Sequence, residues 1–182
     1  MIRFAHFAAL LTFVATTPLL AQPAAVPAVP QPQPQPLSQQ DKEFFSYAAE
    51  DNQAEIALCL LAEKKAHSPA VKAFARLMVD DHVAVESRLA VVANAEKAEL
   101  PEGVGEEGKK THDKLDPLTG SEFETAFLKA QISDHENDLK RFDHETSTTN
   151  NVALRQFASE TGPILEQHLD LAKAIQSSAN SK

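Results

Sequence analysis

Three histidines interrupt apolar helical stripes in this chain of 182 residues. His82, His135 and His168 each stand where the spacing of three and four residues calls for an apolar side chain, and Glu55 has a comparable place in an earlier stripe. Polar side chains in a dry core destabilise a protein unless they are hydrogen-bonded, paired or bound to a ligand. Three imidazoles and one carboxylate suit a single Zn, Cu, Ni or Fe ion. The pattern therefore predicts a metal site of Glu55, His82, His135 and His168, provided that the four helices pack side by side.

Two further carboxylates are candidates for the same site. Glu86 follows His82 by one helical turn, and Asp138 follows His135 by three residues. Three acids lie near the histidines in sequence, but adjacent positions on a helix point about 100° apart, so these acids can hydrogen-bond an imidazole only from a neighbouring helix. These acids are Asp81, Asp134 and Glu166.

A second interpretation explains the same residues without a metal. Glu55 and the histidines could form a closed network of buried hydrogen bonds. The histidines could also lie at different heights and never meet. The sequence leaves these alternatives open.

Four long helices are expected to carry these residues. Each has an apolar face with helical spacing, no segment shows sustained alternation with a period of two, and the chain has only 5 glycines. Capping boxes are expected at Ser38, with Asp41 in place of the usual Glu, and at Ser121, with Glu124. The first expected helix runs from 38 to about 66, and the second runs from 68 to just before Pro101. The third begins at about 121 and ends before a polar turn at 146–151, and the fourth follows this turn.

The connection between the second and third of these helices is long. Residues 98–120 hold several prolines and glycines, with a short helix expected at 106–115. Such a segment suits a crossover along the length of a bundle. The predicted fold is all-α, an up-down four-helix bundle of ferritin-like type with a long crossover between helices 2 and 3. In the last helix, Gly162-Pro163 is expected to produce a kink or to loosen hydrogen bonds.

The N-terminal region has the features of an export signal. Arg3 precedes an almost wholly apolar run, and Ala21 offers a small residue for cleavage. We therefore expect a signal peptide at 1–21, a Pro/Gln-rich linker at 22–37 and a folded domain at 38–182. The mature protein is expected to be periplasmic or secreted, without a transmembrane segment; the alternative is an uncleaved N-terminal anchor. A formal net charge of −9 argues against nucleic acid as a partner.

A set of short motifs is similar to the bacterial domain of unknown function 4142 family. The longest is FARLMVDDH at 74–82, which resembles the family signature FA..MV.DH. Shorter matches lie at 54–56, 120–123, 134–136 and 165–169, so the resemblance covers roughly residues 40–176. It implies an exported, ferritin-like four-helix protein of the outer membrane or periplasm, without an established activity. It also implies that Glu55, His82, His135 and His168 occupy recurring polar positions of the family.

The sequence lacks the motifs of several known chemistries, which excludes some classes of function. Ferritin-like di-iron proteins carry Glu three residues before His, whereas the residues at that place here are Val79, Ile132 and Leu165. There is no Gly-rich phosphate loop and no Ser/His/Asp arrangement for nucleophilic catalysis. Our main interpretation is a non-catalytic envelope or stress-related protein with a buried His/Glu core. The alternative is a metal-binding protein, with sequestration or metal-dependent oxidase activity.

Overall fold

The computed structural model describes residues 36–180, and this stretch contains five α-helices and no strand. The helices are α1 (Gln39–Lys65), α2 (Pro69–Glu96), α3 (Gly105–Leu115), α4 (Gly120–Thr148) and α5 (Val152–Asn180). The expected signal peptide at 1–21 and nearly all of the expected linker lie outside the described residues. None of the helices in the described stretch has an apolar segment long enough to cross a bilayer.

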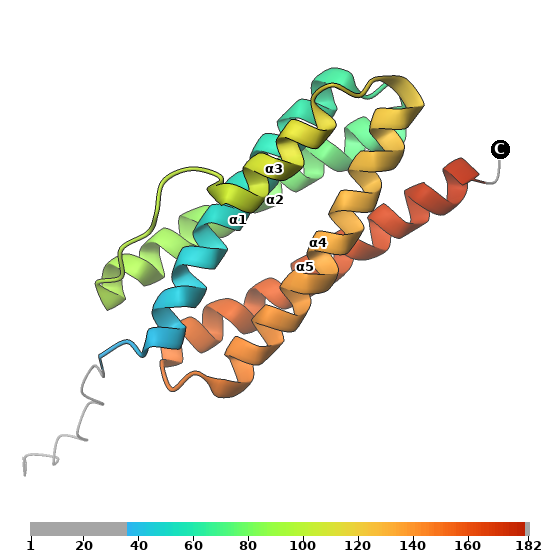
Figure 1. Ribbon diagram of the computed structural model, residues 1–182. Coiled ribbons are helices and arrows are strands. Elements are labelled where there is room, and N and C mark those ends of the chain that lie inside the picture. Colours follow the sequence, from blue (N-terminus) through green and yellow to red (C-terminus); the bar gives the residue numbers. More distant parts are fainter. Residues whose placement is uncertain (1–35, 181–182) are drawn as a thin grey trace, which may run out of the picture. The chain divides into compact units, whose positions relative to one another are not determined.

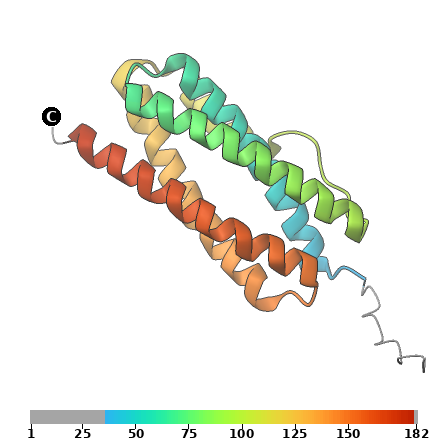
Figure 2. The same ribbon diagram turned by 180° about the vertical axis from the view of Figure 1, so that it is seen from behind.

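The long helices form two antiparallel hairpins that pack on each other. α1 pairs with α2 and α4 pairs with α5, while further contacts join α2 to α5 and α1 to α4 (Figure 1). The view from behind shows α2 beside α5 (Figure 2). The long connection after α2 returns the chain to the end at which α4 begins, and α3 within it packs against α1 and α4. The expected short helix and the expected long connection are both confirmed.

The apolar core has two parts with a polar layer between them. One cluster includes Met78 and the other includes Val85, and His82 lies between these two residues on α2. In the same way, His135 on α4 and His168 on α5 each lie between a residue of one cluster and a residue of the other. Phenylalanines fill both clusters, among them Phe45 and Phe127, which are fully buried. Apolar packing on both sides of the layer therefore holds the histidines in place.

The two expected capping boxes have different outcomes. At Ser38 the box is confirmed: the Ser38 hydroxyl accepts the N–H of Asp41, and the Asp41 carboxylate accepts the N–H of Ser38. The expected box at Ser121 is wrong, because α4 begins one residue earlier, after Thr119, and no side chain caps it. Glu124 instead accepts the N–H groups of His67 and Ser68 at the start of α2, over 2.6 and 2.7 Å. The backbone N–H groups at the start of α2 therefore find their acceptor on a neighbouring helix.

Helix α5 continues through Pro163 as a single helix. Proline lacks the N–H that would bond to the carbonyl four residues earlier. Two residues before Pro163, the Thr161 hydroxyl donates to the Phe157 carbonyl over 2.8 Å. The helix therefore reaches His168 without an interruption of its helical backbone.

Candidate metal centre

Three helices bring their histidines to one point in the polar layer. His82 comes from α2, His135 from α4 and His168 from α5, and their exposed fractions are 3%, 1% and 1%. Their ring centroids lie 5.4–6.0 Å apart. One nitrogen of each ring lies within 4.8 Å of the nitrogens of the other two. The three side chains thus lie at the same height and face one another.

Asn52 on α1 fixes the protonation of His82. The Asn52 amide nitrogen donates to the backbone carbonyl of His82 over 3.0 Å, so the amide oxygen faces the ring. That oxygen lies 2.9 Å from His82 Nδ1 and can only accept. His82 Nδ1 therefore carries the hydrogen, and its Nε2 keeps a lone pair.

The other two imidazoles are fixed in the same manner. His135 Nδ1 lies 3.0 Å from the carbonyl oxygen of Gln131, one turn earlier on α4, and must donate to it. His168 Nε2 lies 2.9 Å from Asp81 Oδ2 on α2, and burial of a neutral ring beside a carboxylate makes this nitrogen the donor. The free lone pairs are therefore those of His135 Nε2 and His168 Nδ1.

The three free lone pairs belong to rings that converge to within 4.8 Å of one another, and they lack a donor. His135 Nε2 and His168 Nδ1 are 3.4 Å apart, but two lone pairs cannot form a hydrogen bond with each other. His82 Nε2 is buried without any hydrogen-bond partner. An unsatisfied buried acceptor costs about 1–3 kcal/mol. Two nitrogens bound about 2.0–2.1 Å from a tetrahedral metal lie roughly 3.4 Å apart, so the donor set fits a metal ion.

Burial keeps the three imidazoles neutral at pH 7. It lowers the pKa of His82 well below its ordinary value, with the other two rings adding to the effect. Burial and the neighbouring His168 ring lower the pKa of His135 to about 4, although its bond to the Gln131 carbonyl acts in the opposite direction. Burial also lowers the pKa of His168, against the raising effect of Asp81. Neutral rings are the form that ligates a metal.

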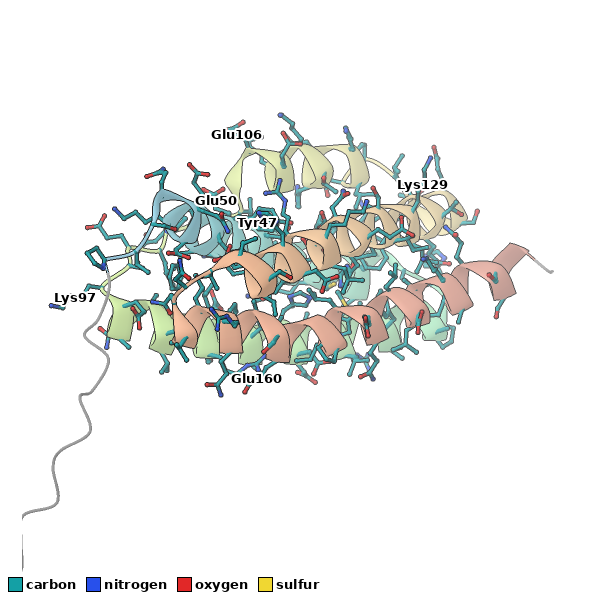
Figure 3. All side chains as sticks on the ribbon, turned by 90° about the horizontal axis from the view of Figure 1, so that it is seen from below. Tyr47, Glu50, Lys97, Glu106, Lys129 and Glu160 are labelled. Atoms are coloured by element: carbon teal, nitrogen blue, oxygen red, sulfur yellow. The ribbon has the colours of Figure 1, made fainter. Side chains whose placement is uncertain are left out.

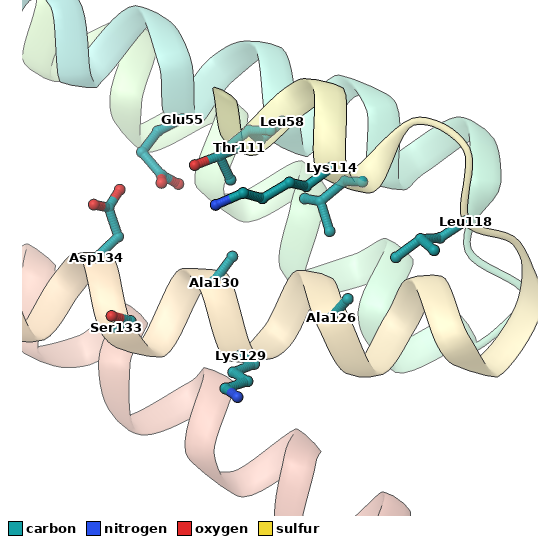
Figure 4. Close-up of a pocket in the computed structure, with 11 residues that line it drawn as sticks. Glu55, Leu58, Thr111, Lys114, Leu118, Ala126, Lys129, Ala130, Ser133 and Asp134 are labelled. Carbon is teal, nitrogen blue, oxygen red and sulfur yellow. The ribbon is translucent and has the colours of Figure 1, made fainter. Parts of the chain in front are cut away.

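The carboxylates expected at this site lie elsewhere. Glu55 Oε1 accepts a hydrogen bond from the Gln131 side chain over 3.1 Å, and Glu55 faces Asp134 (Figure 4). Glu55 is not a member of the histidine group of converging ligand atoms. Asp138 accepts a hydrogen bond from the Tyr47 hydroxyl. Glu86 is half-buried and belongs to neither group of converging ligand atoms within residues 36–180. Of the expected set, the group of converging ligand atoms within residues 36–180 contains the three histidines and does not include Glu55, Glu86 or Asp138.

Two residues of the site were missed from the sequence. Asn52 stands in the apolar stripe of α1, and this polar interruption was the available signal for it. Gln131 precedes His135 by one turn, and its backbone role has no sequence signal at all. The bond from His168 to Asp81 joins α5 to α2, as expected for an acid acting from a neighbouring helix.

Comparison with known proteins gives one structural neighbour and one family. The structure of CopM in the Cu(II)-bound form superposes with a TM-score of 0.64 at 16% sequence identity, covering 76% of this chain and 96% of that one. At this identity the likeness shows a shared fold. None of the curated proteins matches the chain. The model of the domain of unknown function family DUF4142 matches residues 26–175. The chain therefore belongs to the DUF4142 family.

Proposed function

We propose that this protein binds one transition-metal ion through His82 Nε2, His135 Nε2 and His168 Nδ1, and that copper is the preferred ion. The observation that carries the proposal is the convergence of three buried lone pairs, each fixed by a hydrogen bond on the far side of its ring. Such outer partners orient the ligands of metal sites and raise their basicity. A metal ion would satisfy all three nitrogens at once.

The donor set and the structural neighbour both favour copper. Imidazole ligands suit Cu, Zn, Fe and Ni, and divalent copper binds nitrogen sites most tightly in this series. The neighbour of similar fold was solved in its Cu(II)-bound form. Three protein ligands would leave a position open for water or for a ligand from a partner.

The proposal includes a setting and an architecture. We infer that α1, α2, α4 and α5 form a ferritin-like four-helix bundle, because each contacts two of the others in a closed ring. We also place the protein outside the cytoplasm, on the signal peptide expected at 1–21. The role is binding or sequestration of metal in the cell envelope, without catalysis.

A metal-free structural core is the competing candidate. Its support is that the hydrogen bonds of His82 and His168 each join two helices, α1 to α2 and α2 to α5. Interhelical bonds of this kind stabilise a fold without any ligand.

Copper titration of untagged, metal-stripped protein decides between the two candidates. We expect one Cu(II) per chain, nitrogen hyperfine splitting from imidazoles in the electron paramagnetic resonance spectrum, and a higher melting temperature on loading. Replacement of His82, His135 and His168 by Ala should abolish binding. The matched control replaces three histidines outside the group, which are His67, His112 and His144. Failure of the wild type to bind Cu(II), Zn, Ni or Fe would leave the structural role.

A further inference from the structure

A second group of ligand atoms lies between α1 and α4, away from the histidines. Asp51 and Glu55 are one turn apart on α1, and Asp134 and Asp138 are one turn apart on α4. One carboxylate oxygen each from Asp51, Asp134 and Asp138 lies within 4.8 Å of the other two. The Glu55 carboxylate points at Asp134 across the gap between the helices (Figure 4). Four carboxylates thus meet at one interface.

Two of these carboxylates are fully buried and lack a donor for one oxygen. Glu55 and Asp138 are both 0% exposed. Glu55 Oε1 is bonded to Gln131 and Asp138 Oδ1 to Tyr47, whereas Glu55 Oε2 and Asp138 Oδ2 have no hydrogen-bond partner. Ionised carboxylates only accept hydrogen bonds, so the neighbouring acids cannot satisfy these oxygens. A shared proton or a cation is therefore needed between the acids, and the experiments below distinguish the two.

No basic side chain of the described stretch forms an ion pair with these carboxylates, although the charge of Arg141 favours the ionised forms of Asp51 and Asp138. None of the ion pairs found within residues 36–180 involves any of the four carboxylates. The nearby guanidinium of Arg141 lies over the Tyr47 ring, 4.1 Å from its centroid. Lys114 extends into the pocket beside Glu55 but forms no ion pair with it (Figure 4).

Two cavities beside α3 border this group. A cavity of about 450 Å³ is lined by Glu55 and Asp134, together with residues of α3 and α4. A second cavity, of about 250 Å³, is lined by Asp51, Asp134 and residues of α3. Tyr47 and Glu50 lie on the side of α1 that faces α3, where Glu106 is located (Figure 3). A hydrated cation therefore has a path to the carboxylates.

We propose that Asp51, Glu55, Asp134 and Asp138 form a second cation site, which binds a hard divalent ion of the Ca²⁺ or Mn²⁺ class. Carboxylate oxygens are the ligands that such ions prefer, and four carboxylates offer enough oxygens for six or more bonds. The histidine group offers only nitrogens, so the two sites select different ions. This proposal does not depend on copper binding, because the two sites have no ligand in common.

Mn²⁺ is the probe for this site, because the six-line paramagnetic resonance signal of the free ion disappears on binding. The full chain should bind one Mn²⁺, and Ca²⁺ should displace it. The double variant Asp134→Asn with Asp138→Asn should bind at least tenfold more weakly, since it keeps side-chain volume and removes two charges. The control, Glu99→Gln with Glu102→Gln, removes two charges from exposed residues of the connection after α2 and should bind like the wild type.

Three further measurements separate the possible results. Circular dichroism should show that the asparagine variant is folded, and the single variant Asp51→Asn, at a half-buried residue, should also weaken Mn²⁺ binding. The histidine triple variant should retain Mn²⁺, which separates this proposal from copper binding. Folded wild type that binds neither Mn²⁺ nor Ca²⁺ at 1 mM, or an asparagine variant that binds like the wild type, would overturn the proposal in favour of protons shared between the acids.

Discussion

The neutral state of His135 makes the stability of the metal-free protein depend on pH. Its pKa is about 4 in the folded protein and about 6.5 in an unfolded chain. As pH falls, the unfolded chain takes up the proton first, and protonation therefore favours unfolding. The stabilisation is complete above pH 6.5 and is lost progressively between pH 6.5 and about pH 4.

The size of this effect follows from the two pKa values. The difference amounts to about 3 kcal/mol over the whole range, and about 2 kcal/mol is lost between pH 7.5 and pH 5. The buried acids act in the opposite direction: burial and the neighbouring Asp134 raise the pKa of Asp138 to about 7, so it contributes stability at low pH that is lost as pH rises towards 7. A comparison between variants is needed to isolate the histidine.

The variant His135→Gln removes the titrating ring and keeps an amide that can donate to the Gln131 carbonyl. We expect its free energy of unfolding to fall by about 2 kcal/mol less than that of the wild type between pH 7.5 and pH 5. Urea unfolding followed by circular dichroism, with a chelator present, measures the difference. The control is His144→Gln, at an exposed residue of the same helix, which should keep the wild-type slope. Parallel pH profiles for wild type and His135→Gln would refute a buried neutral ring.

Three other changes test separate parts of the structure. Asp81→Asn should weaken copper binding about 10–100-fold in a chelator competition, because it alters the acceptor that orients His168, and an unchanged affinity would remove that role. Gly108→Ala should lower stability by about 1–3 kcal/mol in thermal unfolding, since the added Cβ would lie 2.5 Å from the Ala54 side chain; an unchanged melting temperature would mean that α3 can move away freely. Ser38→Ala should cost about 1 kcal/mol in urea unfolding through loss of the capping box, and no loss would show that the first turn of α1 is held by other contacts.

The helices and the burial of the histidines could be predicted because they follow from spacing, whereas the common height of the three rings depends on how the helices are aligned. Each histidine takes one place in a stripe of apolar residues, and packing the stripes together buries all three. On α2, for example, the apolar residues Met78 and Val85 lie on either side of His82 and belong to the two core clusters that enclose the polar layer. The connection after α2 could be assigned from its prolines and glycines alone.

The partners of the polar residues could not be predicted, because the sequence does not fix how a helix is rotated about its axis. Asn52 and Glu55 are three residues apart on α1, yet Asn52 bonds to His82 while Glu55 faces α4. A rotation of some tens of degrees exchanges such roles. The hydrogen bonds at the N-terminus of α2 could not be predicted for the same reason, since Glu124 on α4 accepts the N–H of His67 there.

The histidines are far apart along the chain, and this has a consequence for when metal can be acquired. His82 and His168 are 86 positions apart, so no single helical hairpin holds all three ligands. The proposed metal pocket is completed only when α5, the last of the described helices along the chain, docks onto α2 and α4. A chain threaded through a membrane pore in extended form would carry no ion with it. Metal would then be loaded from the compartment in which the protein folds, and not from the one in which it is made.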